Sequence, residues 1–205
     1  MYETLQNDVS EYLCIPKFNR KWEADKKKGA GFYYALTYPH ILRFFEEHQP
    51  LSEALELKVA LIFSWNPKIC EVTSERFREA ESELSKLEGS IGKELRTKDI
   101  VDVDIRKVIG ELWQPVKKVT SSSDSTSGVS VTKFLHFSFP HIFPMVDLKT
   151  MKRLGGASVN LKWYSTLLSA WRDLYKRQRA SFDEISKAVV MPVPRVLDIM
   201  IFTPQ

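Results

Sequence analysis

The chain has 205 residues, of which 43% are hydrophobic and 27% charged, and it carries a formal net charge of +4. That length and balance are typical of one folded domain and exclude a mainly disordered chain. No apolar run reaches the roughly 18 residues of a membrane span, and the first residues lack the basic and apolar regions of a signal peptide. We therefore expect a cytoplasmic protein without membrane contact. The mildly basic charge permits a polyanionic partner such as DNA.

Helical spacing of apolar residues recurs along the chain and strict alternation is nearly absent, which predicts an all-α fold. We expect a single compact multi-helix domain over residues 1–205, with residues 17–31 as a basic, glycine-containing loop. In the first half the predicted helices are 2–13, 32–48 with an interruption at Pro39, 52 to the Asn66-Pro67 pair, 74–87, and 99–113 ended by Pro115.

The second half opens with a tract of serine, threonine, aspartate and glycine at residues 120–128. This tract has no apolar side chain to bury, so we expect a flexible surface loop. The predicted helices after it are 129–139, 147–154 closed by a glycine pair, 159–177 capped by Ser158, a helix opened by a capping box at Ser181, and 195–202.

Several familiar site motifs are missing. The sequence has neither of the glycine-rich phosphate-binding motifs, and neither H-E-x-x-H nor G-x-S-x-G. The four histidines do not show zinc-ligand spacing with the two cysteines, and two cysteines do not make a secreted disulfide framework. We therefore predict no cofactor and no metal site.

The segment from Gly128 to Asp147 places several titratable side chains inside an apolar run. Lys133 lies in the first turns of an apolar helix, where desolvation of the ammonium lowers the lysine pKa. A neutral lysine amine can act as a nucleophile and form a Schiff base. Asp147 follows a proline-bounded turn, where a carboxylate can stabilise positive charge on a sugar or activate a water.

Each of these residues also has a purely structural interpretation. Lys133 can extend its ammonium to solvent while burying its methylenes. Asp147 is well placed to be the N-cap of the helix that follows. His136, one turn after Lys133, can be a packing histidine that makes hydrogen bonds.

The segment carries a resemblance to known proteins. The pattern Lys133-x-Leu-His136, then Pro-x-x-Phe-Pro144, then Asp147 is similar to a motif of poorly characterised prokaryotic proteins. More distantly, Gly128-Val, Lys133, the Pro144 to Asp147 turn and a downstream arginine resemble the helix-hairpin-helix DNA glycosylases. Ser130 stands where that hairpin has its second glycine.

The resemblance to the glycosylases implies an all-helical fold that binds DNA phosphates at the hairpin and flips a target base into a pocket. It implies Lys133 as the Schiff-base nucleophile and Asp147 as the catalytic carboxylate, with His136 orienting groups or relaying protons. Basic residues would then contact phosphate, and the candidates are Lys149, Lys152, Arg153, Arg172 and Lys176. The last two recur at helical spacing, which is also typical of a solvated helix face.

We therefore expect a nucleic-acid-binding protein with glycosylase-like base-excision chemistry. One alternative is a non-enzymatic helical interaction module, with the aromatic segment 32–45 and the final helix as contact surfaces. Another is a small-molecule enzyme with a pocket beside residues 120–128.

Overall fold

The computed structural model describes residues 1–26, 30–64, 72–122 and 128–201, and within those ranges the chain forms helices and no strand. The all-α prediction is confirmed. The α-helices are α1 (Tyr2–Ser10), α2 (Ile15–Lys26), α3 (Ala30–Glu47), α4 (Leu55–Ser64), α5 (Ser74–Leu87), α6 (Lys93–Leu95), α7 (Ile105–Thr120), α8 (Val129–Ser138), α9 (Leu148–Arg153), α10 (Leu161–Val189) and α11 (Val193–Ile201). A π-helical turn, Glu88–Gly92, joins α5 to α6, and a 3₁₀ turn, Ile100–Asp102, precedes α7.

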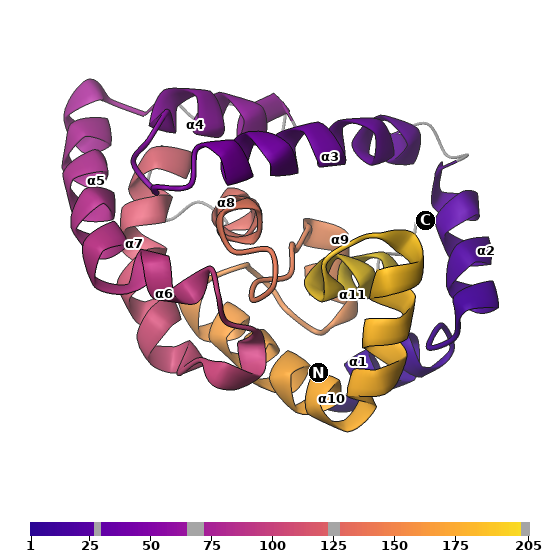
Figure 1. The fold of residues 1–205 in the computed structure, drawn as a ribbon. Coiled ribbons are helices and arrows are strands. Elements are labelled where there is room, and N and C mark those ends of the chain that lie inside the picture. The colour runs from indigo at the N-terminus through magenta and orange to yellow at the C-terminus, as the bar shows by residue number, and fades with distance from the viewer. Residues whose placement is uncertain (27–29, 65–71, 123–127, 202–205) are drawn as a thin grey trace.

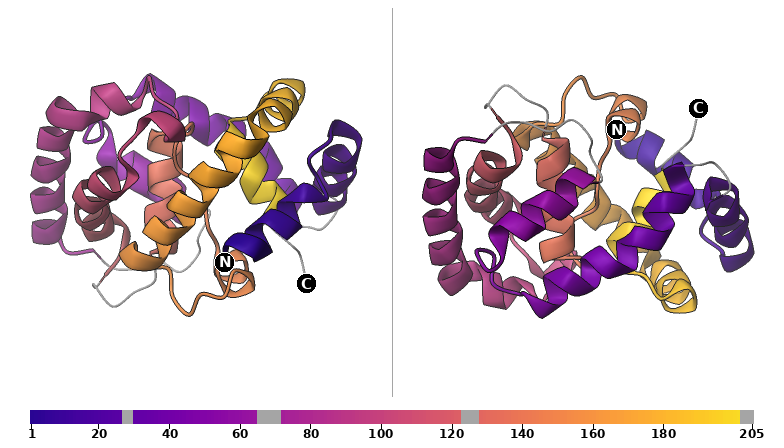
Figure 2. Two further views of the ribbon diagram at one scale, coloured as in Figure 1. Left: turned by 90° about the horizontal axis from the view of Figure 1, so that it is seen from below. Right: turned by 90° about the horizontal axis from the view of Figure 1, so that it is seen from above.

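Helix α8 lies at the centre of the molecule, with α3 and α4 above it, α7 beside it and α10 below it in the view of Figure 1. The views from below and above agree (Figure 2), and α8 contacts α3, α4 and α7. Every residue of α8 except Lys133 and Ser138 is buried. A helix that is buried over nearly its whole circumference is covered by other elements on all sides, so the fold is organised around α8.

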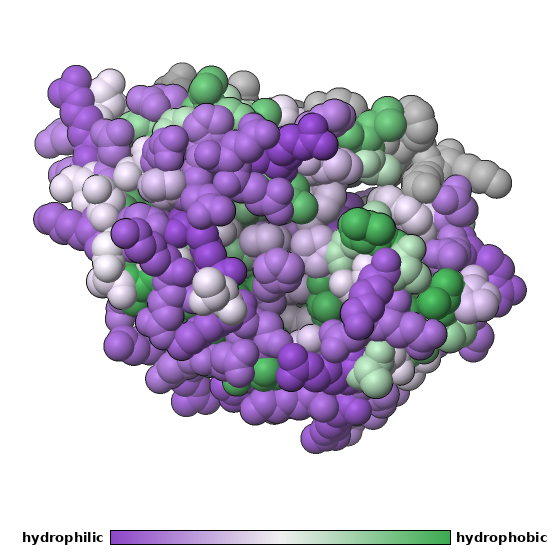
Figure 3. Space-filling model, viewed as in Figure 1, coloured by the Kyte–Doolittle hydropathy of each residue, from purple (hydrophilic) through white to green (hydrophobic). Residues whose placement is uncertain are grey.

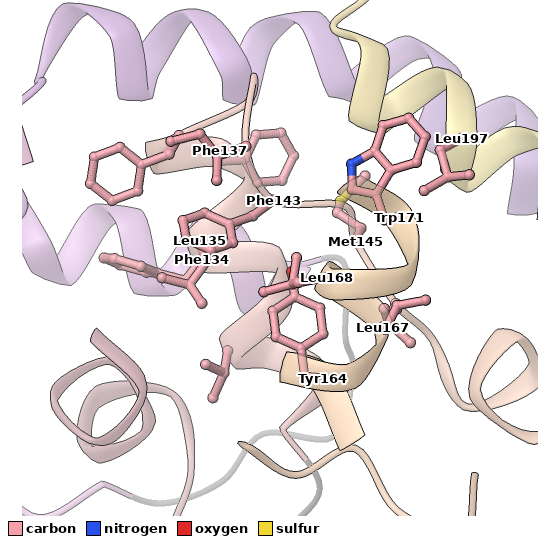
Figure 4. Packing of buried hydrophobic residues seen from close by; sticks show 14 of the residues in the cluster. Phe134, Leu135, Phe137, Phe143, Met145, Tyr164, Leu167, Leu168, Trp171 and Leu197 are labelled. Carbon is pink, nitrogen blue, oxygen red and sulfur yellow. The ribbon is translucent and has the colours of Figure 1, made fainter. Parts of the chain in front are cut away.

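One hydrophobic cluster fills the space around α8, and helices from both ends of the chain contribute to it. Phe45 of α3 packs against Phe134 and Phe137 of α8, with ring centroids 5.6 and 5.5 Å apart. Figure 4 shows side chains of α8, of the segment after it, of α10 and of α11 converging on this cluster. Burying one such large side chain contributes about 1.5–3 kcal/mol, so the cluster dominates the stability of the fold.

Helices α7 and α8 pack on each other across the predicted loop at 120–128. The amide of Gly128 donates to the carbonyl of Val159 (2.7 Å), and a Cβ at Gly128 would lie 2.5 Å from the Trp113 ring. Glycine is therefore required here because the backbone runs against an indole. Ser121 and Gly128 are both buried, and residues 123–127 of the predicted flexible loop lie outside the described residues.

The predicted loop at 17–31 is wrong at every described residue, because Ile15–Lys26 forms helix α2 and α3 begins at Ala30. The apolar side chains of this segment are spaced as in a helix: Phe18 is fully buried, and Ile15 and Trp22 pack partly buried against the core. The many charged residues in this segment concealed that short stripe, and burial against the rest of the protein outweighs weak local preference.

Two prolines that we expected to interrupt helices lie inside them. Helix α3 continues through Pro39, and α7 continues through Pro115. A proline removes one backbone hydrogen bond, and packing offsets that loss here. Tyr38 and Ile41 on either side of Pro39 are buried, and so are Trp113 and Val116 around Pro115.

The C-terminal helices differ from prediction mainly at their ends. Helix α10 is capped by Asn160, whose side chain accepts from the Trp163 amide (3.0 Å), and not by Ser158. The break expected after residue 177 is present as non-helical backbone at Gln178, but Ser181 lies within the helix and is not a cap. Helix α4 begins at Leu55, later than the predicted Ser52, and the Asn66-Pro67 pair lies outside the described residues.

The face seen in Figure 1 is covered mostly by hydrophilic side chains, and its hydrophobic side chains form small separate patches (Figure 3). The final helix, which the interaction-module alternative needs as a contact surface, is buried from Pro194 to Ile201. That part of the alternative is therefore wrong. In the described ranges no helix combines the length and the apolar character that crossing a membrane requires.

Candidate active site

The turn between α8 and α9, residues 139–147, is held in place by side chains from two helices. Thr132 of α8 accepts from the amide of Val146 (3.1 Å). Tyr164 of α10 donates its hydroxyl hydrogen to the carbonyl of Pro144 (2.7 Å). These buried bonds fix the backbone that leads into Asp147, because each would leave an unsatisfied polar group if it were broken.

His136 is a third anchor of this turn. Its Nδ1 lies 2.7 Å from the carbonyl oxygen of Phe143, and its Nε2 lies 2.8 Å from the hydroxyl of Tyr38. A carbonyl only accepts, so Nδ1 carries the proton and Nε2 accepts from the tyrosine. Burial lowers the pKa of His136 to about 3, so the imidazole is neutral at physiological pH.

The expectation that His136 relays protons is therefore corrected. The side chain is fully buried and both ring nitrogens are engaged. It has a structural task instead, which is to connect α8 to Tyr38 of α3 and to the turn before Asp147. The structure therefore shows His136 as a packing histidine that makes hydrogen bonds, which is the structural interpretation offered from the sequence.

Asp147 is the N-cap of α9. Its Oδ1 accepts from the amide of Thr150 at 2.6 Å, and its side chain is partly exposed. The predicted helix start is confirmed, and such a cap contributes about 1 kcal/mol. This hydrogen bond also fixes the direction of the carboxylate. The same carboxylate can cap the helix and stabilise a positive charge on a reacting group.

Lys133 is the one partly exposed residue in the otherwise buried first half of α8. Burial lowers its pKa from 10.5 to about 8, against the opposing attraction of Asp147 and then Asp198. Asp147, at the start of α9, and Asp198, in α11, are thus electrostatic neighbours of the same ammonium. The structure thus brings Lys133 within electrostatic range of Asp147, and that these two residues form one catalytic site stays a prediction.

Asp198 is the site residue that the sequence analysis passed over. It is buried within the apolar helix α11, where its carboxylate forms an ion pair with Arg195 one turn earlier. The Arg195 guanidinium lies 4.9 Å from the centre of the Tyr38 ring. Burial raises the pKa of Asp198 to about 6, although Arg195 favours the charged form. The available signal was an arginine and an aspartate three apart in an apolar helix, where buried charges need partners.

Some of the predicted phosphate-contacting residues are exposed, and others already interact with an aspartate. Lys149, Lys152 and Lys176 are exposed. Arg153 is exposed as well, but its guanidinium makes two hydrogen bonds to Asp8 of α1, at 2.6 and 2.7 Å. Arg172 is half-buried, and its Nε lies 4.0 Å from Oδ1 of Asp173. The lysines are therefore better placed than the arginines to meet a phosphate.

A half-open cavity of about 370 Å³ lies at the C-terminal end of α8. It is lined by aromatic side chains of α3 and α8 together with Arg96 and His141. Gly128 lies at the opposite end of α8, so this cavity is not the pocket that the small-molecule alternative places beside residues 120–128.

Among the described residues no three His, Cys, Asp or Glu side chains gather in a way that could hold a metal ion. The chain was also compared with known proteins. No family model, no curated protein sequence and no solved structure matches it. Lys133, Asp147 and Asp198 are therefore the residues from which we infer a function.

Proposed function

We propose that this protein binds DNA and excises a base by a glycosylase-like reaction in which Lys133 is the nucleophile. The observation that supports the proposal is a lysine of lowered pKa on the central helix, within electrostatic range of Asp147 on a rigid turn and of Asp198 on α11. Perturbed titratable groups that converge in this way are characteristic of functional sites.

The lowered pKa of Lys133 has a direct chemical consequence. With a pKa of about 8, about a tenth of the molecules carry the neutral amine at pH 7, against fewer than about one in a thousand for an ordinary lysine. Only the neutral amine can attack a carbon atom. Burial alone therefore supplies the reactive neutral amine of Lys133, and the proposed reaction includes no metal and no cofactor.

In the proposed reaction the Lys133 amine attacks the C1′ atom of a nucleotide turned out of the helix stack. The glycosidic bond breaks, its electron pair leaves with the base, and the base takes a proton from the new C1′–Nζ ammonium. The C1′–O4′ bond then breaks, O4′ keeps its electron pair and takes a proton from water, and the nitrogen lone pair forms the C1′=Nζ Schiff base. Asp147 stabilises the positive charge that develops on the sugar. Its cap bond to Thr150 at 2.6 Å keeps the carboxylate oriented, so no reorganisation is needed as the charge appears.

The exposed lysines near the site supply the DNA contacts in this proposal. Lys149 and Lys152 project from α9, whose N-cap is Asp147, so a DNA backbone held by them would pass close to the proposed catalytic carboxylate. Lys176 on α10 is the third exposed candidate. Each neutralised phosphate makes the logarithm of the binding constant fall by about 0.9 per logarithmic unit of salt.

Fluorescence anisotropy with labelled single- and double-stranded DNA over a salt series tests the binding. Three phosphate contacts predict a slope of about −3, and Lys149→Gln is expected to reduce its magnitude by about 0.9. Lys118→Gln is the control, because the Lys118 ammonium already pairs with Glu83 at 2.7 Å and the slope should not change. Absence of binding even at low salt would contradict the proposal.

A further inference from the structure

The half-open cavity of about 370 Å³ at the C-terminal end of α8 has an apolar floor and a polar rim. Buried apolar side chains line its inner part, and these are Phe45, Leu95, Phe137 and Phe139. Exposed polar residues line its outer part, and these are Glu46, Gln49 and His141. Pockets that bind small molecules measure roughly 300–1,000 Å³ and combine a mainly apolar lining with a few polar groups. The cavity therefore has the size and the lining of a small-molecule site.

The positive charge on the cavity wall is already balanced by a residue outside the cavity. The Arg96 guanidinium makes two hydrogen bonds to the carboxylate of Glu88, one of them 2.7 Å long, and another to the carbonyl of Gln49. It also lies over the Phe139 ring, 5.6 Å from the ring centre. Arg96 is thus engaged by Glu88, so the carboxylate of Glu46 gives the rim a negative charge that Arg96 does not neutralise.

Two helices end at this cavity. Glu46 lies in the last turn of α3, which ends at Glu47, and Phe137 lies in the last turn of α8, which ends at Ser138. The last carbonyl groups of a helix carry partial negative charge, so a helix C-terminus favours cations and disfavours anions. The faces of aromatic rings attract cations as well. The helix ends, the phenylalanine rings and Glu46 therefore all favour a positively charged ligand.

Ser138 supplies a hydrogen-bonding group in the same lining. Its Oγ is buried and has no hydrogen-bond partner among the described residues. Buried polar atoms nearly always have a partner, so such an atom calls for an explanation. An ammonium group has three N–H donors and no acceptor. A ligand ammonium in the cavity can therefore donate to Ser138 Oγ and to the Glu46 carboxylate.

We propose that this cavity binds a small aromatic amine in its protonated form. The ring of the ligand packs on the phenylalanine floor, and its ammonium lies between Glu46 and Ser138. The inference goes beyond the proposed function, because neither Lys133 nor Asp147 lines the cavity. It assigns a second site to the molecule, for a ligand of a different class from DNA.

Three probes of matched size separate charge from shape. Benzylamine is a cation at pH 7, benzyl alcohol is neutral and benzoate is an anion. Each would be titrated into the full chain, with binding followed by NMR from the backbone amides of Glu46, Ser138 and His141. Benzylamine should shift these signals with a dissociation constant on the order of 1 mM. It should bind about fivefold tighter than benzyl alcohol, and benzoate should bind most weakly.

Three results on wild type would overturn the inference. One is that benzylamine leaves these amide signals unshifted at concentrations up to about 10 mM, ten times the constant expected for a ligand of this size. Another is equal affinity for benzylamine and benzyl alcohol, which would mean an apolar cavity without selectivity for charge. The third is tighter binding of benzoate than of benzylamine, which would mean a site for anions.

Two variants test the polar contacts. Glu46→Gln should weaken benzylamine binding about three- to fivefold and leave benzyl alcohol binding unchanged, because only the cation meets the carboxylate. Glu47→Gln is the matched control, since Glu47 is also exposed on α3 but does not line the cavity, and binding should not change. Ser138→Ala should weaken benzylamine binding about fivefold without lowering the melting temperature, because the hydroxyl has no bond to lose. Unchanged benzylamine affinity in either Glu46→Gln or Ser138→Ala would overturn the inference.

Discussion

At the scale of single residues, Lys133 and His136 show that burial can prepare one side chain of a helix for chemistry and give another a structural role. Both lie on the same face of α8, and burial lowers the pKa of both. His136 makes two hydrogen bonds, at 2.7 and 2.8 Å, and these hold its neutral ring in one tautomer. Lys133 remains partly exposed, so its low basicity is available for chemistry.

Replacing Lys133 by methionine should stabilise the protein. The folded pKa of about 8 lies below the ordinary 10.5, so at pH 7 the folded state carries the full cost of a desolvated charge. We expect Lys133→Met to raise the free energy of unfolding by about 1–3 kcal/mol at pH 7. Between pH 8 and 10.5 the folded wild type loses the Lys133 proton and with it the cost of the desolvated charge. The stability advantage of Lys133→Met should therefore fade over that range.

Urea unfolding at several pH values measures this difference. Lys149→Met, on the exposed face of α9, is the matched control and should show no pH-dependent gain. A Lys133→Met variant that is no more stable than wild type at pH 7, or whose gain persists at pH 10.5, would contradict the assignment of a desolvated lysine.

Replacing His136 by phenylalanine should cost about 2–4 kcal/mol at pH 7, because the Tyr38 hydroxyl and the Phe143 carbonyl lose their partners. The cost should shrink by about 2 kcal/mol at pH 4.5. Below about pH 6.5 the unfolded wild type binds a proton at His136, whereas the folded protein does so only near pH 3. Wild type therefore loses stability on acidification, and the variant does not.

Chemical unfolding at pH 7 and pH 4.5 checks this prediction. His40→Phe, at an exposed position of α3, is the control and should stay within about 0.5 kcal/mol of wild type. A His136→Phe cost that is equally large at both pH values would mean that the histidine takes up its proton in the folded state.

At the scale of helices, local signals located some helix ends and misplaced others. Asp147 was recognisable as an N-cap because an aspartate before an apolar turn favours a helix start, and helix α5 was predicted with its observed bounds. Pro39 and Pro115 were misleading because their effect depends on tertiary packing that no local pattern reveals. Helix α2 was missed for the same reason, since its formation depends on the burial of Phe18.

The junction of α7 and α8 gives a prediction about glycine. In Gly128→Ala the new Cβ would lie 2.5 Å from the Trp113 ring and 2.9 Å from the Val159 carbonyl oxygen. Because one of these neighbours is backbone and the other a buried indole, we expect a loss of about 2–3 kcal/mol. Gly110→Ala, with nothing within 4 Å of the new Cβ, should instead gain about 0.5–1 kcal/mol.

Thermal unfolding of the two glycine variants gives opposite signs if this packing is correct. Equal shifts of the melting temperature would indicate that Gly128 has room for a side chain and that α7 and α8 are not held as closely as described.

At the scale of the whole molecule, the site is assembled from segments that lie far apart in the sequence. Lys133 and Asp147 could be paired from the sequence because a resemblance connects them within one short segment. Asp198 and Tyr38 could not, since α11 and α3 approach α8 only after the chain has folded around that helix. The surrounding hydrophobic cluster keeps these groups together, and the proposed chemistry depends on that rigidity.

If Lys133 is the nucleophile, it forms a covalent bond to DNA, and borohydride trapping detects that bond. Wild type would be incubated with duplexes that carry different damaged or modified bases, reduced with borohydride, and resolved by denaturing electrophoresis. We expect a protein–DNA adduct with at least one duplex, located at Lys133 by peptide mass spectrometry and absent from a folded Lys133→Gln variant. If no duplex is trapped, or if Lys133→Gln is trapped as well as wild type, Lys133 is not the nucleophile.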